Sequence, residues 1–295
     1  MRNAFVQELC ALAAQRPNIA LVVGDLGYSV VEPFQAAFPD RFFNAGVAEQ
    51  NMTGLAAGLA SEGYHVFTYS IANFPTFRCA EQLRNDVAYH GLSVTVVTVG
   101  GGLAYGALGY SHHAVQDYAL IRTLPGMTIA APGCPMEVRS CIRYLVANPG
   151  PSYLRLGKAG EPAIHIEPPD LAPGRWVPIK LCGVERRAFL ATGAALSAAL
   201  VWADVAEYRD YAVFSLPLWG MGAKSVQESQ LGAFDEVITL EDHLNDGGMG
   251  SWLLEAANAS NSKCRVRIRG LDATVCGEVG SQSTLNRIGG LFPAL

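Results

Sequence analysis

The sequence has 295 residues, half of them apolar, which is enough to build two compact domains. Charged residues make up only 16% of the chain, below the roughly 25% that is typical of soluble domains, so we expect a large protein–protein interface. The net charge of −5 and the lack of a basic run argue against nucleic acid and against an anionic membrane as partners.

Cysteine usage and the N-terminal residues indicate a cytoplasmic protein. The seven cysteines are dispersed, without a C-x-x-C pair or a Cys/His cluster of metal-binding spacing, which is typical of reduced thiols. Glu8 lies where a signal peptide would need its apolar core. Residues 92–110 are uncharged, but their glycines favour a buried strand followed by a glycine-rich loop over a membrane span.

The first half of the chain alternates short apolar, β-branched runs with segments of helical spacing. This alternation predicts parallel strands that are covered by helices on both faces. We expect helices at 3–14, from Glu49 onward, and at 79–89, 115–123 and 135–147. We expect strands at 19–23, 42–43, 65–69, 93–99, 128–131 and 153–156.

A second α/β unit follows a proline-rich segment. Residues 161–178 contain five prolines and little periodicity, so we predict a first domain at 1–160, a linker at 161–180 and a second domain at 181–295. In the second domain we expect strands at 188–191, 211–216, 237–240 and 266–270. Its helices are expected at 195–207 and after the glycines at 247–250.

The most specific motif is the run G-V-A-E-Q-N-M at 46–52, which follows a short strand and opens a helix poor in bulky side chains. From the chemistry alone, Glu49 could simply complement the helix dipole. The run resembles the motif of the pyrimidine-binding domain of transketolases, especially the beta chains of split, two-subunit enzymes. The later run E-D-H and G-G-M-G-S-W, at 241–252, is similar to the C-terminal domain of the same family.

The resemblance implies two three-layer α/β domains with mainly parallel sheets, and thiamine diphosphate as cofactor. It implies that Glu49 hydrogen-bonds a ring nitrogen of the aminopyrimidine and favours the tautomer that can take up the proton of the cofactor's reactive carbon. The family's G-D-G motif and its distant Asn, which hold Mg²⁺ and the diphosphate, are missing from this chain. We therefore expect a separate alpha subunit that supplies the metal ligands, in an α2β2 assembly, and no metal ligand in this chain.

Aromatic residues after the third strand match the family's pyrimidine site. Split transketolases read S-F-A-I-F-A-T-G-R, where this chain reads S-I-A-N-F-P-T-F-R at 70–78. Ile71 stands in for the usual stacking Phe, so about 0.5–1.5 kcal/mol of ring stacking is lost. Phe74 and Phe77 supply aromatic rings. Together with Asp25 and Glu49, these residues form the expected cofactor site, although Phe74 could equally be a core residue.

Five further positions match the family's sugar-phosphate site, each of which could otherwise be an ordinary loop residue. Arg2 and Ser29 align with an Arg and a Ser of the family. Lys158 stands where the family usually has Arg, so the point charge of an ammonium replaces a guanidinium that can bind phosphate through two hydrogen bonds. His112 matches a donor-site His, and His113 stands where Gln is more common. As neutral imidazoles they could hydrogen-bond substrate hydroxyls, and His112 could relay protons.

The glycine-rich loop departs most from the family. Split transketolases usually read G-E-D-G-x-S-H-Q, whereas residues 106–113 read G-A-L-G-Y-S-H-H. Leu108 thus replaces an Asp that recognises the hydroxyl of an α-hydroxyaldehyde acceptor, and a His that often precedes the loop is replaced near Gly100. Losing that acceptor disfavours such a substrate, so Leu108 predicts an atypical acceptor.

We therefore expect the beta subunit of a two-component transketolase that moves a two-carbon ketol unit from a ketose phosphate donor to an acceptor. One alternative is a 2-oxoacid dehydrogenase-like or acyloin-forming beta subunit, which would decarboxylate a keto acid. Another is a non-catalytic regulatory or scaffolding paralogue. The lost acids and Ile71 favour this alternative, whereas Glu49 argues against it.

Overall fold

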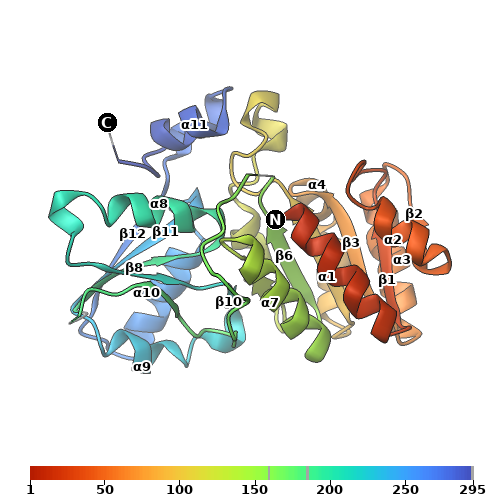
Figure 1. The fold of residues 1–295 in the computed structure, drawn as a ribbon, viewed down its shortest axis with the longest axis horizontal. Coiled ribbons are helices and arrows are strands. Elements are labelled where there is room, and N and C mark those ends of the chain that lie inside the picture. Colours follow the sequence, from red (N-terminus) through yellow and green to blue (C-terminus); the bar gives the residue numbers. More distant parts are fainter. Residues whose placement is uncertain (159, 184–185, 294–295) are drawn as a thin grey trace.

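The computed structural model describes residues 1–158, 160–183 and 186–293. The chain forms two lobes, each a β-sheet between two layers of helices, and the lobes lie side by side along the long axis of the molecule (Figure 1). Both sheets are mainly parallel, as the sequence predicts.

The first sheet has the strand order β10-β5-β6-β4-β3-β1-β2, in which β1 to β6 run parallel. Its strands are buried on both faces because they consist of continuous apolar and β-branched runs. Their bounds are β1 Ile19–Val23, β2 Phe42–Asn44, β3 His65–Ile71, β4 Val94–Val99, β5 Thr128–Ala130, β6 Ser152–Leu156 and β10 Leu218–Trp219.

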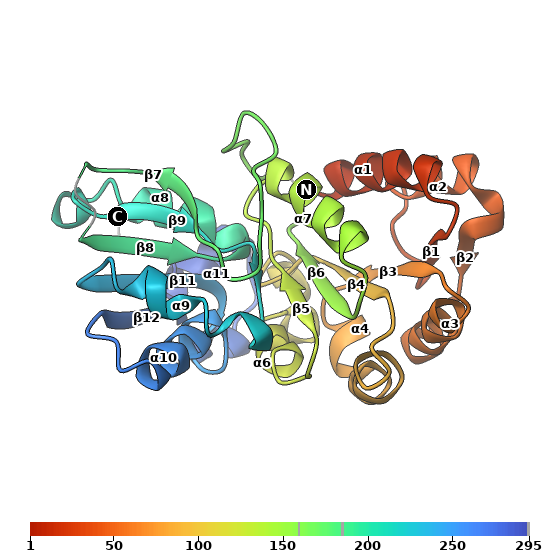
Figure 2. The same cartoon turned by 90° about the horizontal axis from the view of Figure 1, so that it is seen from below.

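Helices cover both faces of this sheet (Figure 2). One face carries α1 Arg2–Gln15, α2 Glu32–Ala37 and α7 Pro135–Ala147. The other carries α3 Glu49–Ser61, α4 Phe74–Phe77, α5 Ala80–Gln82, the π-helical turn η2 Leu83–Ala88 and α6 Asp117–Ile121.

The second sheet has the order β12-β11-β8-β9-β7, and β7 alone runs antiparallel to its neighbour. Its strands are β7 Val177–Lys180, β8 Arg187–Ala191, β9 Ala212–Ser215, β11 Glu236–Leu244 and β12 Arg265–Leu271. Helices α8 Leu196–Trp202 and α11 Gln282–Ile288 lie on one face, and α9 Gln227–Leu231 and α10 Met249–Ala259 on the other (Figure 1).

Several elements differ from those that periodicity predicts. The last four residues of the segment at 161–180 form strand β7 of the second sheet, and the unpredicted strand β10 from the second half of the chain pairs with β5 of the first sheet. The helix expected at 115–123 begins only at Asp117, because Ala114 is held extended in a bridge with Gly102. The helix expected at 79–89 widens into η2, where the Tyr89 N–H donates to the Arg84 carbonyl 3.0 Å away.

The two lobes share one core and one buried ion cluster. Tyr118, Trp219 and Trp252 form a continuous aromatic row, with ring centroids 5.2 and 5.6 Å apart. Arg155 on β6 donates to Asp117 Oδ2 at 2.7 Å and to Asp242 Oδ1 at 2.5 Å, and all three side chains are buried. Burial alone would lower the pKa of Arg155, but the two carboxylates outweigh it and raise the pKa.

The E-D-H run on β11 holds the second lobe in place. The Glu241 carboxylate accepts from the N–H groups of Met249 at 2.6 Å and Gly250 at 2.8 Å, and so caps the start of α10. His243 accepts from the Ala119 N–H at Nε2 (3.3 Å), which leaves Nδ1 to donate to the Leu244 carbonyl. The motif is therefore part of the junction between the lobes.

None of the helices in the described residues is both long and apolar enough to cross a membrane. Within the same residues there is no group of three or more His, Cys, Asp or Glu side chains arranged to hold a metal ion.

We expect Arg155→Met to lower the free energy of unfolding by about 3–5 kcal/mol, because it leaves the Asp117 and Asp242 carboxylates buried without their cation. Urea denaturation at pH 7.5 measures the loss. Arg187→Met removes an exposed pair with Asp210 and should cost less than about 1 kcal/mol. Equal losses in the two variants would contradict this account of the junction.

Stability should also fall in mild acid because of His65. Burial, helped by the charge of Arg16, lowers the pKa of His65 from 6.5 to about 4, and Nε2 lies 2.8 Å from Thr95 Oγ1. The folded state keeps the His65 ring neutral, whereas the unfolded chain protonates it below pH 6.5. The free energy of unfolding therefore falls as the pH drops from 6.5 toward 4, by about 3 kcal/mol in total. Urea denaturation at pH 7.5 and pH 5 measures this loss of stability. The loss between the two pH values should be smaller in His65→Gln and unchanged in the exposed-site control His90→Gln.

Candidate functional site

The predicted site residues gather at one edge of the first sheet. Because β1, β2, β3, β4 and β6 are parallel, their carboxyl ends meet at the same edge. Asp25 follows β1, Glu49 follows β2, Phe74 follows β3, His112 lies in the loop after β4 and Lys158 follows β6. The topology therefore brings together residues that are far apart in the sequence.

Glu49 is the first residue of α3 and is buried. Its Oε2 accepts from Nη1 of the half-exposed Arg78 at 3.2 Å. Its Oε1 is buried and has no hydrogen-bond partner among the described residues. A buried acceptor that lacks a donor is costly, so this oxygen marks a place where a donor from outside the chain fits.

Arg78 and two aromatic rings stand next to this acid. The Arg78 guanidinium lies 4.0 Å from the centroid of the Phe74 ring, and the Phe74 ring meets the edge of the His112 ring at 5.3 Å. Burial, together with the positive charge of Arg78, lowers the pKa of His112. At neutral pH His112 is therefore an uncharged ring beside a cation.

These residues open onto a groove of about 380 Å³, which we call the aromatic groove. It is lined by Asn73, Phe74, Phe77, Arg78, Tyr110, Ser111 and Gln116. Asn73 fixes its far wall, since its amide donates to the His113 carbonyl at 2.6 Å. Phe77 is half exposed in the groove, whereas Ile71 is partly buried at the end of β3 and does not line it.

The glycine-rich loop after β4 divides its predicted residues between surface and interior. Leu108 is exposed in the turn η3 Gly106–Leu108, and His112 ends the turn η4 Tyr110–His112. His113 is completely buried, and its Nε2 lies 3.4 Å from the Gly106 carbonyl. His113 therefore supports the loop from inside, while its Nδ1 has no partner among the described residues.

A second group of side chains gathers around Arg2, at the start of α1. Burial raises the pKa of the Tyr69 and Tyr105 phenols, and the positive charge of Arg2 partly opposes this rise. The Lys158 ammonium lies 5.1 Å from the Tyr105 ring. Arg2 lies within hydrogen-bonding reach of the buried Tyr69 phenol, whose own O–H has no acceptor among the described residues.

The loop after β1 carries strain at both of its predicted residues. Asp25 and Ser29 have φ angles of 55° and 64°, which cost of order 1 kcal/mol or more for residues other than glycine. Asn44 Nδ2 donates to Asp25 Oδ1 at 2.9 Å, and the Ser29 N–H donates to Glu32 Oε1 at 2.7 Å. Among the described residues, no hydrogen bond or ion pair joins this loop to the Glu49 carboxylate.

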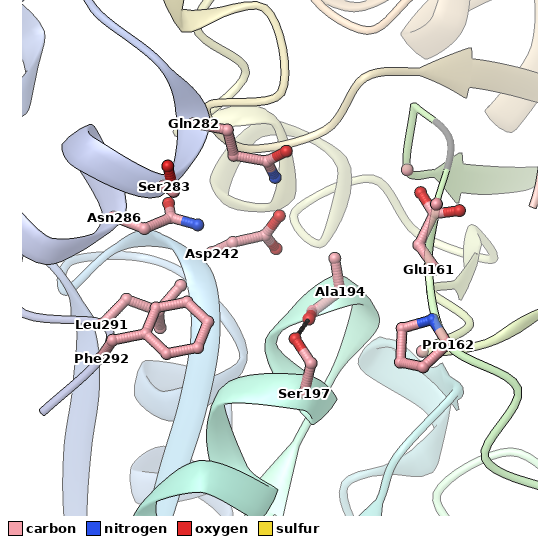
Figure 3. A pocket seen from close by; sticks show the side chains of 13 residues that line it. Glu161, Pro162, Ala194, Ser197, Asp242, Gln282, Ser283, Asn286, Leu291 and Phe292 are labelled. Atoms are coloured by element: carbon pink, nitrogen blue, oxygen red, sulfur yellow. Dashed lines mark hydrogen bonds between the residues drawn. The ribbon is translucent and has the colours of Figure 1, made fainter.

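A separate cavity of about 240 Å³ lies between the lobes (Figure 3). Asp242, Gln282 and Asn286 face it from the second lobe, and Glu161, which accepts from the N-terminal amine at 2.8 Å, stands on the opposite side. None of the predicted site residues lines it.

Two residues of the site were missed by sequence reasoning. Arg78 ends the run S-I-A-N-F-P-T-F-R, and that position could have suggested a partner for Glu49. Tyr105 is a bulky side chain five residues after Gly100 in a loop of small residues, which is the only trace of its role in the sequence.

Comparison with known families identifies the first half of the chain. Residues 1–160 match the family described as "Transketolase, pyrimidine binding domain". This match spans more than half of the chain and includes β1 to β6 with the site described above.

Relatives and a solved structure extend the similarity to the whole chain. A Methanocaldococcus jannaschii protein described as a transketolase C-terminal section is 32% identical over 275 residues, which cover 89% of this chain and 84% of the relative. A Clostridium sp. protein, "6-deoxy-6-sulfo-D-fructose transketolase subunit SqwH", is 30% identical over 99% of this chain and 90% of its own length. The solved structure "Split gene transketolase, inactive beta4 tetramer" superposes with a TM-score of 0.85 at 30% identity, covering 99% of this chain and 93% of the other.

Proposed function

The chain belongs to the transketolase family, in which it corresponds to the beta subunit of a split enzyme, and we propose that with an alpha subunit it transfers a two-carbon ketol unit between sugars. The observation that carries this proposal is the buried Glu49 Oε1, which lacks a donor at the start of α3. The relatives' names support the reaction class.

The residues around Glu49 fit the aminopyrimidine end of thiamine diphosphate. A protonated ring nitrogen supplies the donor that Glu49 Oε1 lacks, and the Phe74 ring offers an apolar face next to it. When bound, the cofactor would supply the nucleophilic carbon that ketol transfer requires. Glu49 orients the ring and shares its proton, Arg78 holds the second carboxylate oxygen, and neutral His112 can accept or return a proton on a substrate hydroxyl.

An alpha subunit completes the proposed site. The chain lacks the family's G-D-G motif, so we assign the Mg²⁺ and diphosphate ligands to that partner, in an α2β2 assembly. Large apolar side chains are exposed along the edge that carries the site, as an interface requires: Tyr28, Val47, Leu55, Phe77, Leu108 and Tyr110. The beta-only tetramer among the solved structures is described as inactive, which supports a need for the partner.

The proposed donor is a ketose with an anionic end. Arg2 and Lys158 place two cations at the edge of the sheet, and Ser29 offers a hydroxyl on the strained loop. One relative is named for a sulfonated fructose, so phosphate and sulfonate are the candidate end groups. Exposed Leu108, without an acceptor atom, leads us to propose an acceptor other than an ordinary hydroxyaldehyde phosphate.

We also propose a cytoplasmic location, because several cysteines are buried and form no disulfide, as in proteins from reducing compartments: Cys79, Cys134, Cys141 and Cys264.

We expect Glu49→Gln to lower kcat of the complex with its alpha subunit by about 10²–10⁴-fold, because the amide cannot share the ring proton. Steady-state release of D-glyceraldehyde 3-phosphate from D-xylulose 5-phosphate, with acetaldehyde as acceptor, measures the loss. Glu62→Gln, at the other end of the same helix, serves as the control and should keep wild-type turnover.

Retention of turnover in Glu49→Gln would favour a scaffolding subunit. Release of labelled carbon dioxide from pyruvate by the wild-type complex, without ketol transfer, would favour the 2-oxoacid dehydrogenase-like alternative.

We expect Leu108→Asp to raise kcat/KM for glycolaldehyde about tenfold relative to acetaldehyde, because the new carboxylate accepts from the hydroxyl that only glycolaldehyde carries. Release of D-glyceraldehyde 3-phosphate from D-xylulose 5-phosphate as donor, measured with each acceptor in turn, gives both values. Leu108→Ala opens the same space without an acceptor atom and should leave the ratio unchanged. The same gain in both variants would show that size, and not hydrogen bonding, sets the acceptor preference.

A further inference from the structure

Tyr105 occupies space that a side chain at position 100 would otherwise fill. Gly100 has a φ of +81°, and a Cβ built on it would lie 2.1 Å from Cε2 and 2.3 Å from Cδ2 of the Tyr105 ring. Only glycine adopts this backbone without strain and leaves room for the ring. The Tyr105 ring is therefore fixed against the carboxyl end of β4.

The half-buried Tyr105 is surrounded by the basic side chains of the candidate site. Lys158 Nζ lies 5.1 Å from its ring centroid, and the His112 ring meets it edge-on at 6.5 Å. Arg2 is close enough to act on the phenol electrostatically. Tyr105 therefore packs beside His112, which is predicted to act on substrate hydroxyls, and beside Lys158, which is predicted to bind the far end of the substrate.

Donors are in excess around this ring. Arg2 lies within hydrogen-bonding reach of the almost completely buried Tyr69 phenol, whose oxygen can accept from Arg2 while its own O–H has no acceptor among the described residues. Arg2 and Lys158 add positive charge and no acceptor. Buried donors without acceptors fit a ligand with several oxygens and a negative charge, such as a phosphate or sulfonate group.

We propose that Tyr105 is a specificity-determining residue whose hydroxyl donates to the anionic end group of the substrate. This inference rests on the proposed function and adds to it the residue that recognises the end group. Since a phenol is a neutral donor, it strengthens binding of either anion, while Arg2 and Lys158 set the charge that is preferred.

The test is Tyr105→Phe in the complex with the alpha subunit, because this change removes only the hydroxyl. We expect kcat/KM for D-xylulose 5-phosphate to fall about tenfold through KM, and that for the uncharged donor L-erythrulose to stay within twofold. Tyr144→Phe, on helix α7, is the matched control and should leave both donors unaffected. Equal losses for both donors, or no loss for either, would overturn the inference.

A binding measurement separates this inference from the proposed function. Calorimetric titration of the complex with D-ribose 5-phosphate and with D-ribose needs no turnover. If Tyr105→Phe binds D-ribose 5-phosphate about tenfold more weakly and D-ribose unchanged, the role of Tyr105 is supported even without ketol transfer. A lack of ketol transfer would then contradict only the proposed function. Unchanged binding of both sugars contradicts the role of Tyr105 even in an active transketolase.

The same complex distinguishes the two anions. Inorganic phosphate and methanesulfonate are titrated as competitors of D-ribose 5-phosphate, and the better competitor identifies the end group. Competition that is weakened in Tyr105→Phe supports the inference, and failure of both anions to compete overturns it.

Discussion

The buried guanidinium of Arg155 is the group on which the arrangement of the site depends. It joins Asp117 of the first lobe to Asp242 of the second, and its Nη2 donates to the Ala114 carbonyl at 2.7 Å. A Cβ on Gly101 would lie 2.6 Å from its Nε, so the glycine-rich loop packs directly on the cation. Removing a partner would leave a buried charge uncompensated. The loop that carries His112 and Tyr105 is thus held by the same cluster that joins the lobes.

The E-D-H run shows how a family motif can be structural rather than catalytic. Glu241 caps α10, Asp242 pairs with Arg155, and His243 accepts from the backbone of α6. Asp242 and His243 thus contact groups of the first lobe, whereas Glu241 holds α10 within the second lobe. Their combined effect on the site is indirect, because they fix the position of the loop and make no contact with the aromatic groove.

The site has unsatisfied groups of opposite kind at its two ends. At one end Glu49 Oε1 is an acceptor without a donor, and at the other the Tyr69 O–H, beside the Arg2 cation, is a donor without an acceptor among the described residues. His112, with its lowered pKa, and Tyr105 lie between them. A ligand with a protonated ring nitrogen fits the first end and an anionic sugar the second, which agrees with our proposal that a cofactor, a substrate and a partner chain complete the site.

The sequence by itself determined the α/β class, most strands of both sheets and the position of Glu49 at a helix start, because buried parallel strands and small-residue helices leave strong local patterns. It could not place strands β7 and β10, since two to four residues form a strand only when a neighbouring edge is available. Tertiary structure alone decided that Arg78 pairs with Glu49, that His113 turns inward and that Tyr105 fills the space over Gly100. These contacts join residues from different loops, and their distances follow from how the strands are ordered and how the lobes pack, which local sequence patterns do not encode.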